Sequence, residues 1–192
     1  MRRAFTLIEL MVVVAVIGLL VGILVPALSS ARASAKRTAC AGNLRQVGTG
    51  LQAYISGNRD RFPHASFMPS MSPFPLEVPK AIRIADVIGK EIGDTTAFHC
   101  PNDLSDSGRP APNAGLTYFQ SEGSSYEYRT RPSLGGRTAQ EIAAFYEQRA
   151  DMKIADNAFW VMRDFNNFHA PGGKPGARRY LYSDGHVTDF EN

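Results

Sequence analysis

Residues 1–30 read MRRAFTLIELMVVVAVIGLLVGILVPALSS, and this stretch decides the fold. The 22 positions from Leu10 to Ala31 contain no charged residue. A helix needs about 20 apolar residues to cross the hydrocarbon core of a bilayer, so the stretch is long enough to span one. It is also longer than the apolar core of about 7–15 residues in an ordinary secretory signal peptide. We therefore predict a membrane-spanning helix close to the amino terminus.

One acidic residue, Glu9, stands at the entrance to this apolar run. A charged side chain is costly in a membrane, about 2.5–3.5 kcal/mol at the bilayer centre on insertion scales and less near an edge. Ionisable residues in such segments are therefore functional candidates. The alternative interpretation is an interfacial Glu9 whose carboxylate reaches back to the lipid headgroups.

The charge balance argues against binding to nucleic acid. The whole chain carries 21 Lys and Arg against 18 Asp and Glu, a formal net charge of +3. From Asn58 onward there are 15 basic and 17 acidic residues, so the larger part of the chain has no basic excess to neutralise phosphates.

The helix is expected to continue beyond the membrane segment, past Pro26, to about Gly57. Apolar residues recur at helical spacing on one face, and they are Cys40, Leu44, Val47, Leu51 and Tyr54 or Ile55. This predicts one helix of roughly 50 residues whose second half is amphipathic. Its glycines, Gly48 and Gly50, are expected to weaken it.

The rest of the chain contains short elements joined by long loops. Helices are predicted at 82–92 and 138–150, the latter with Thr138 as N-cap and Glu141 as its capping-box partner. Strands are predicted at 96–101, 116–119, 124–129, 153–155 and 159–162, followed by a hairpin over 180–190. Asp184-Gly185 is expected to form a two-residue type I′ turn in that hairpin. The predicted class is α+β, with a small antiparallel sheet covering the apolar face of the helix.

Two cysteines, Cys40 and Cys100, lie 60 residues apart and form no C-x-x-C motif. A disulfide between them is favoured in an oxidising compartment. Two buried free thiols are the other interpretation, and the sequence leaves both open.

The amino-terminal stretch resembles the prepilin signal of type IV pilins and type II secretion pseudopilins. The resemblance rests on a basic leader, a small residue, Phe5-Thr-Leu-Ile-Glu-Leu10 and the apolar run. It implies cleavage by prepilin peptidase between Ala4 and Phe5, methylation of the Phe5 amine, and a role for Glu9 in assembly. The family usually has Gly where this chain has Ala4.

The resemblance also implies a pilin-like layout of four segments. Residues 1–4 are a leader peptide, 5–28 the transmembrane half of the helix, 29–57 its amphipathic half, and 58–192 a periplasmic or extracellular α+β domain. The expected location is the bacterial inner membrane, with one span and a cytoplasmic amino terminus. The implied partners are prepilin peptidase, other copies or sibling pilins in a filament, and an assembly platform with its ATPase.

Later stretches resemble a subgroup of bacterial pilin-like proteins. They are C-x-x-N-L-R-Q at Cys40–Gln46, the Y…N…F-P pattern from Tyr54 to Pro63, C-P-x-D at Cys100–Asp103, and a closing H-x9-D-G element. In this chain 14 residues separate His169 from Asp184 of that element.

The sequence contains candidate ligands for a metal site but no catalytic motif. Asp156, His169, Asp184 and His186 are candidate ligands for calcium or another divalent metal, although His suits zinc and carboxylates suit calcium. The favoured alternative has Asp184-Gly185 as a turn to which His169 hydrogen-bonds. No nucleophile, metalloprotease or phosphate-loop motif is present, so an enzyme is not expected.

The alternative to a filament subunit is a single-span envelope protein whose domain binds a ligand or metal without polymerising. A further alternative is a secreted domain released by signal peptidase. The lack of an A-x-A site after the apolar run argues against it.

Overall fold

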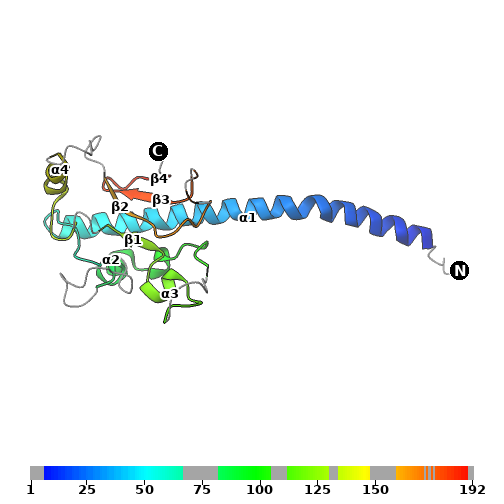
Figure 1. The fold of residues 1–192 in the computed structure, drawn as a ribbon, viewed down its shortest axis with the longest axis horizontal. Coiled ribbons are helices and arrows are strands. Elements are labelled where there is room, and N and C mark those ends of the chain that lie inside the picture. Colours follow the sequence, from blue (N-terminus) through cyan, green and yellow to red (C-terminus); the bar gives the residue numbers. More distant parts are fainter. Residues whose placement is uncertain are drawn as a thin grey trace. The chain divides into compact units, whose positions relative to one another are not determined.

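The computed structural model describes residues 7–66, 82–104, 112–129, 134–147, 159–170, 172, 174 and 176–189. It forms two compact units, Met1–Lys36 and Arg37–Asn192. Helix α1, Leu7–Gly57, begins in the first unit and ends in the second, where the sheet and the core lie (Figure 1). The long helix ends where the sequence predicted.

Within the second unit, α1 buries one stripe of its surface. Its buried members are Cys40, Ala41, Leu44, Val47, Gly48, Gly50, Leu51 and Ile55. The spacing of these residues is that of one helical face, as predicted from the apolar repeat. The stripe is the helical side of the hydrophobic core.

Two glycines of this stripe permit close packing and do not merely weaken the helix. A Cβ atom on Gly48 would lie 2.7 Å from Cδ1 of Leu181, and one on Gly50 would lie 2.2 Å from Cγ1 of Ile92. A side chain at either position would therefore require Leu181 or Ile92 to move, because these residues occupy the space that it would fill.

The sheet has four antiparallel strands in the order β1-β2-β3-β4. The strands are β1 Tyr126–Tyr128, β2 Trp160–Asp164, β3 Arg179–Tyr182 and β4 Val187–Asp189. Tyr126 pairs with Asp164 across β1 and β2, so the end of β2 lies beside the start of β1. Residues of β1, β2 and β3 join the α1 stripe in one core, including Tyr126, Tyr128, Val161, Met162 and Leu181.

The β3–β4 hairpin is present, but its predicted turn type is wrong. Leu181 pairs with Val187, and Tyr182 N donates to His186 O over 2.9 Å, which leaves a loop of Ser183, Asp184 and Gly185. Gly185 has φ +91°, whereas Asp184 is not in the positive-φ region that a type I′ turn requires. The loop is a three-residue connection with glycine in the left-handed position.

The two predicted helices of the domain are confirmed as α2, Ile84–Ile92, and α4, Ala139–Glu147. The capping box of α4 also forms. Thr138 N donates to Glu141 Oε2 over 2.9 Å, and Glu141 N donates to Thr138 Oγ1 over 3.2 Å.

Two predicted strands are wrong. Within 96–101 the structure has the 3₁₀ helix η1, Thr95–Phe98, which starts where Thr96 N donates to Asp94 Oδ1. Within 116–119 the chain enters helix α3, Tyr118–Glu122, behind a capping box of Thr117 and Gln120. In both places a side-chain cap outweighs the local strand preference. The strand predicted at 153–155 lies outside the described residues.

The architecture is α+β, with the long amino-terminal helix packed on a small antiparallel sheet. This confirms the predicted α+β fold class.

Candidate functional site

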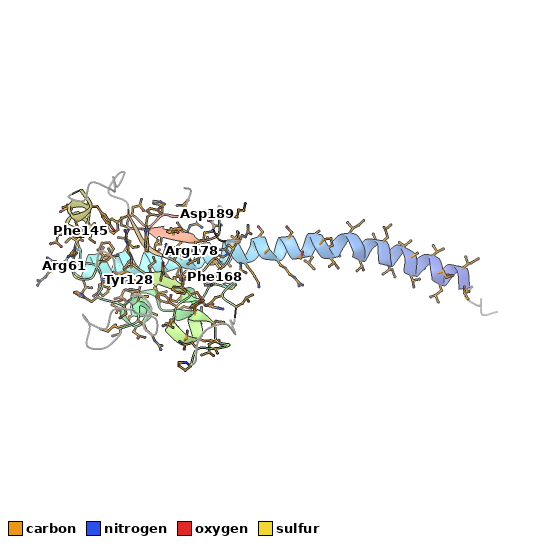
Figure 2. All side chains as sticks on the ribbon, viewed as in Figure 1. Arg61, Tyr128, Phe145, Phe168, Arg178 and Asp189 are labelled. Atoms are coloured by element: carbon orange, nitrogen blue, oxygen red, sulfur yellow. A yellow bond between two sulfur atoms is a disulfide. The ribbon has the colours of Figure 1, made fainter. Side chains whose placement is uncertain are left out.

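The first candidate site is the exposed apolar surface of α1 in the first unit. Its aliphatic side chains are exposed from Leu7 to Leu28 (Figure 2). In the part of the chain that the structure describes, α1 is the one helix long and apolar enough to cross a membrane. A signal sequence near the amino terminus can also meet this criterion of length and hydropathy, so the residues around the segment must decide its role.

Glu9 lies in the first turn of α1 and is exposed. The expected cleavage and methylation positions, Ala4 and Phe5, lie outside the described residues, so their assignment stays a prediction.

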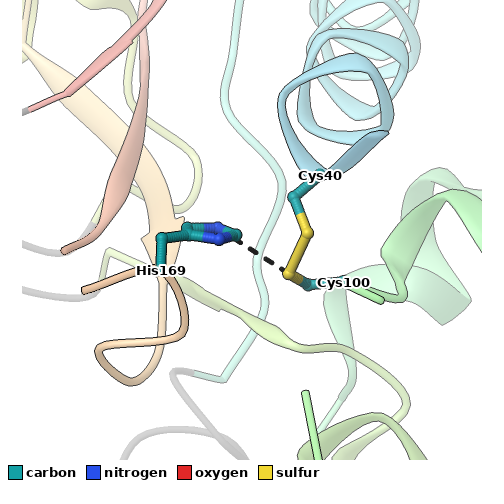
Figure 3. A group of neighbouring side chains, drawn as sticks. All are labelled: Cys40, Cys100 and His169. Atoms are coloured by element: carbon teal, nitrogen blue, oxygen red, sulfur yellow. Dashed lines mark hydrogen bonds between the residues drawn. A yellow bond between two sulfur atoms is a disulfide. The ribbon is translucent and has the colours of Figure 1, made fainter. Parts of the chain in front are cut away.

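The second candidate site lies in the second unit, around a disulfide that joins Cys40 and Cys100 (Figure 3). Both cysteines are fully buried. Cys40 comes from the buried stripe of α1, and Cys100 follows η1 at the start of the C-P-x-D segment. The bond closes a loop of 60 residues and ties this segment to the helix.

The His169 ring lies against this disulfide. Its Nε2 atom is 3.8 Å from Cys100 Sγ and 3.1 Å from Asp164 Oδ2. Its other nitrogen, Nδ1, is 3.0 Å from Asn102 Nδ2. Because an amide nitrogen only donates, Nδ1 accepts this bond and the ring proton resides on Nε2, facing Asp164. The guanidinium of Arg37, on α1, donates to the backbone carbonyl of His169.

Asp164, at the end of β2, is fully buried. Arg179 N donates to its Oδ2 atom over 2.7 Å, whereas Oδ1 has no hydrogen-bond partner among the described residues. Burial raises the pKa of the Asp164 carboxyl, and the hydrogen bond from His169 opposes that shift. The result is a dry group of sulfur, imidazole and carboxylate atoms drawn from α1, the segment after η1 and the end of β2.

A comparison with known families identifies a motif that includes most of the first site. Residues 1–25 match the family model described as the prokaryotic N-terminal methylation motif. This motif marks a prepilin of the type IV pilin and pseudopilin family. The motif implies that prepilin peptidase processes the chain. Together with the apolar helix, it indicates a membrane-anchored protein of the cell envelope.

No curated protein and no solved structure matches this prepilin significantly.

The prepilin's C-P-x-D segment has a structural role that sequence reasoning did not assign. Asp103 is buried and accepts hydrogen bonds from Tyr118 N, Phe119 N and Ser125 Oγ, over 3.1, 2.8 and 2.7 Å. Ser125 Oγ in turn accepts from Cys100 N over 3.0 Å. Asp103 therefore fixes the start of α3 and, through Ser125, the position of Cys100.

Among the predicted metal ligands that the structure describes, His169 does not form one group with Asp184 and His186. Asp156 lies outside the described residues. Asp184 Oδ1 lies 2.6 Å from His186 Nδ1 in an exposed pair, and the His186 ring stacks on Tyr182. The potential ligands that surround His169 in the described ranges include Cys40 and Cys100, not this pair. A metal held by all four predicted residues stays an untested prediction.

The favoured alternative for His169 was a hydrogen bond back to the hairpin turn. The structure instead directs its ring to Asn102, Asp164 and Cys100, while its backbone N–H donates to Ala177 O over 3.3 Å. Asp164 was missed because it belongs to none of the quoted motifs, although it lies five residues before His169. Its position at the end of a buried strand could have indicated a partner, because an unpaired charge is costly there.

Proposed function

We propose that this prepilin is a structural subunit of a pilus or type II secretion pseudopilus, with a mechanical and not a catalytic role. The proposal rests on the exposed aliphatic surface from Leu7 to Leu28, most of which lies within the methylation motif at residues 1–25. An apolar surface of this extent needs lipid or protein to cover it. A membrane covers it before assembly, and the helices of other subunits cover it in a filament.

Glu9 is proposed to select the axial register between subunits. After cleavage, the Phe5 amine carries a positive charge close to the apolar surface. A carboxylate and an ammonium attract each other far more strongly in a medium of low dielectric constant than in water. Glu9 of one subunit and Phe5 of its neighbour would pair only in one axial register, so other registers would leave a costly unpaired charge.

The proposed partners follow from this assembly. Prepilin peptidase cuts before Phe5, and an assembly platform driven by an ATPase extracts the processed chain from the inner membrane. Copies of the chain or sibling pilins complete the filament. The orientation proposed is a cytoplasmic leader and an external domain.

The first test is mass spectrometry of the protein purified from its native membrane. The expected amino terminus is N-methylated Phe5. A chain that retains Met1, or one that begins near Ala31, would contradict processing as a prepilin. An unprocessed, monomeric chain would favour the single-span envelope protein that does not polymerise.

The second test is incorporation of variants into sheared filaments. Glu9→Ala is expected to be cleaved and methylated normally but to be lost from filaments. The matched control is Glu91→Ala, which removes an exposed carboxylate from α2 and should assemble like the wild type. Normal incorporation of Glu9→Ala would refute the register role of Glu9.

A further inference from the structure

We propose that Cys40, Cys100, His169 and Asp164 form a zinc site when the Cys40–Cys100 disulfide is reduced. The domain would then have two mutually exclusive states. In one, the disulfide links Cys40 to Cys100, and in the other, the metal links them. This site differs from the predicted group at Asp184 and His186, and it does not depend on filament assembly.

The donor atoms have the right identity, and those that surround His169 Nε2 have suitable spacing. Structural zinc takes four ligands from Cys, His and Asp or Glu at about 2.0–2.3 Å in tetrahedral geometry, which places neighbouring ligand atoms about 3.3–3.8 Å apart. His169 Nε2 lies 3.8 Å from Cys100 Sγ and 3.1 Å from Asp164 Oδ2. The two sulfurs and a ring nitrogen of His169 all lie within 4.8 Å of one another. Loss of the covalent bond would let the sulfurs separate and admit the ion.

The carboxylate supplies an independent reason for a cation. Asp164 is fully buried, yet its Oδ1 atom has no partner in the described part of the domain. An ionised carboxylate without full compensation is costly in a dry interior. A divalent ion bound by Asp164 would compensate this group and the two thiolates, and Arg37 adds a positive charge beside His169.

The surroundings hold the ligands in place. Ser125 Oγ accepts from Cys100 N, and Asp103 accepts from Ser125, so the Cys100 loop is fixed by buried hydrogen bonds. Asn102 contacts the His169 nitrogen that faces away from the cluster. Rotation of its amide would present an oxygen to an Nδ1 proton, the usual support for a metal-bound histidine.

The conversion balances with a thiol reductant. A dithiol transfers two electrons and two protons to the disulfide, so Cys40 and Cys100 become thiols and the dithiol becomes a disulfide. Zinc then displaces the two thiol protons to solvent and binds both sulfurs as thiolates. The His169 proton moves from Nε2 to Nδ1, which frees Nε2 as a ligand.

The experiment uses the full chain in detergent and Zn²⁺ as the probe. One sample is reduced with a water-soluble phosphine, which becomes the phosphine oxide with oxygen from water; the other stays oxidised. After incubation with Zn²⁺ and removal of free ions, the reduced chain should retain about one zinc per chain and the oxidised chain none. With Co²⁺ as a second probe, only the reduced chain should show a thiolate-to-cobalt absorption band.

Variants separate this site from adventitious binding. Asp164→Asn and His169→Gln should each weaken zinc binding at least about tenfold in the reduced chain. The matched control is Asp184→Asn with His186→Gln, which removes an exposed carboxylate–imidazole pair and should leave binding unchanged. If a variant loses its fold, circular dichroism with and without Zn²⁺ replaces affinity as the measurement. In that measurement, the reduced wild-type chain should keep or regain its fold when Zn²⁺ is added.

Three results would overturn the proposal. They are equal zinc retention by the oxidised and reduced chains, loss of binding in the Asp184 and His186 control, and a reduced wild-type chain that neither binds zinc nor is stabilised by it.

Discussion

The two halves of α1 are parts of one helix but have opposite relations to their surroundings. Leu19, in the first unit, is 67% exposed, whereas Leu44, in the second, is 0% exposed. The first half is apolar on all sides, which is typical of a helix surrounded by lipid or other helices. The second half is apolar along one stripe, which is typical of a helix packed on a single domain. The distribution of apolar residues around the helix, not their number, separates an assembly surface from a folding core.

The glycines make the same distinction. A side chain on Gly22 would meet nothing within 4 Å, whereas one on Gly50 would meet Ile92. The first glycine is unconstrained within its own chain, and the second is required by the packing of α2. Matched positions in the two halves should therefore respond differently to the same substitution.

The largest effect is expected from Leu44→Ala. It removes a fully buried side chain from the core and should lower the free energy of unfolding of the domain by about 2–5 kcal/mol. Leu19→Ala is the matched change in the first half and should leave this free energy unchanged. The measurement is denaturation of the full chain in detergent, followed by the fluorescence of Trp160, the one tryptophan of the chain. Equal losses in both variants would refute the division of α1.

Gly50→Val should have the next largest effect. The new side chain would overlap Ile92, and overpacking of this kind costs about 1–3 kcal/mol. Gly22→Val, the control, should not change the unfolding transition of the domain. A Gly50→Val chain as stable as the wild type would mean that α2 can move away from α1 without cost.

Alkaline pH should destabilise the domain through Tyr128, which packs in the core beside the α1 stripe. Burial raises the pKa of its hydroxyl well above the ordinary value of 10.0. Above pH 10 the unfolded chain loses this proton while the folded chain keeps it, so stability is full below pH 10 and falls as the pH rises toward the folded pKa. The slope for one such group is at most about 1.4 kcal/mol per pH unit.

Tyr128→Phe tests this assignment. It should flatten the decline above pH 10 by the share of one tyrosine, while removing at every pH the hydrogen bond from the hydroxyl to Pro63 O. Denaturant titrations on both sides of pH 10 provide the comparison. An unchanged slope would show that Tyr128 ionises equally in the folded and unfolded chains.

The smallest effect is expected for a polar residue. Asn43 Nδ2 donates to His99 O over 2.7 Å, so Asn43→Ala should cost the domain about 1 kcal/mol. Ser29 Oγ donates to Pro26 O over 2.9 Å within the exposed half, and Ser29→Ala should leave the domain unaffected. The same fluorescence measurement distinguishes them. A cost for Ser29→Ala equal to that for Asn43→Ala would contradict the contrast.

The parts of the fold that depend on residues close together in sequence could be predicted from local patterns. The α1 stripe follows from apolar spacing, and the start of α4 follows from Thr138 and Glu141. The strand predicted at 116–119 failed because Asp103 and the Thr117 cap stabilise a helix there. The surroundings of His169 could not be predicted, since Asn102 and Cys100 reach it from a segment 67–69 residues away and no motif marks Asp164. The prepilin signal was predictable because it is a contiguous motif.

The contact between Gln52 and Ser183 spans 131 residues, which sets the order in which the domain can fold. Chains are synthesised at about 5–20 residues per second, so Ser183 is synthesised about 7–26 s after Gln52. Throughout that interval the apolar stripe lacks the strand that covers it, and contacts of such long range are intrinsically slow to form. A slowly completed core of this kind leaves time for a folding helper or a protease to reach the stripe before β3 does.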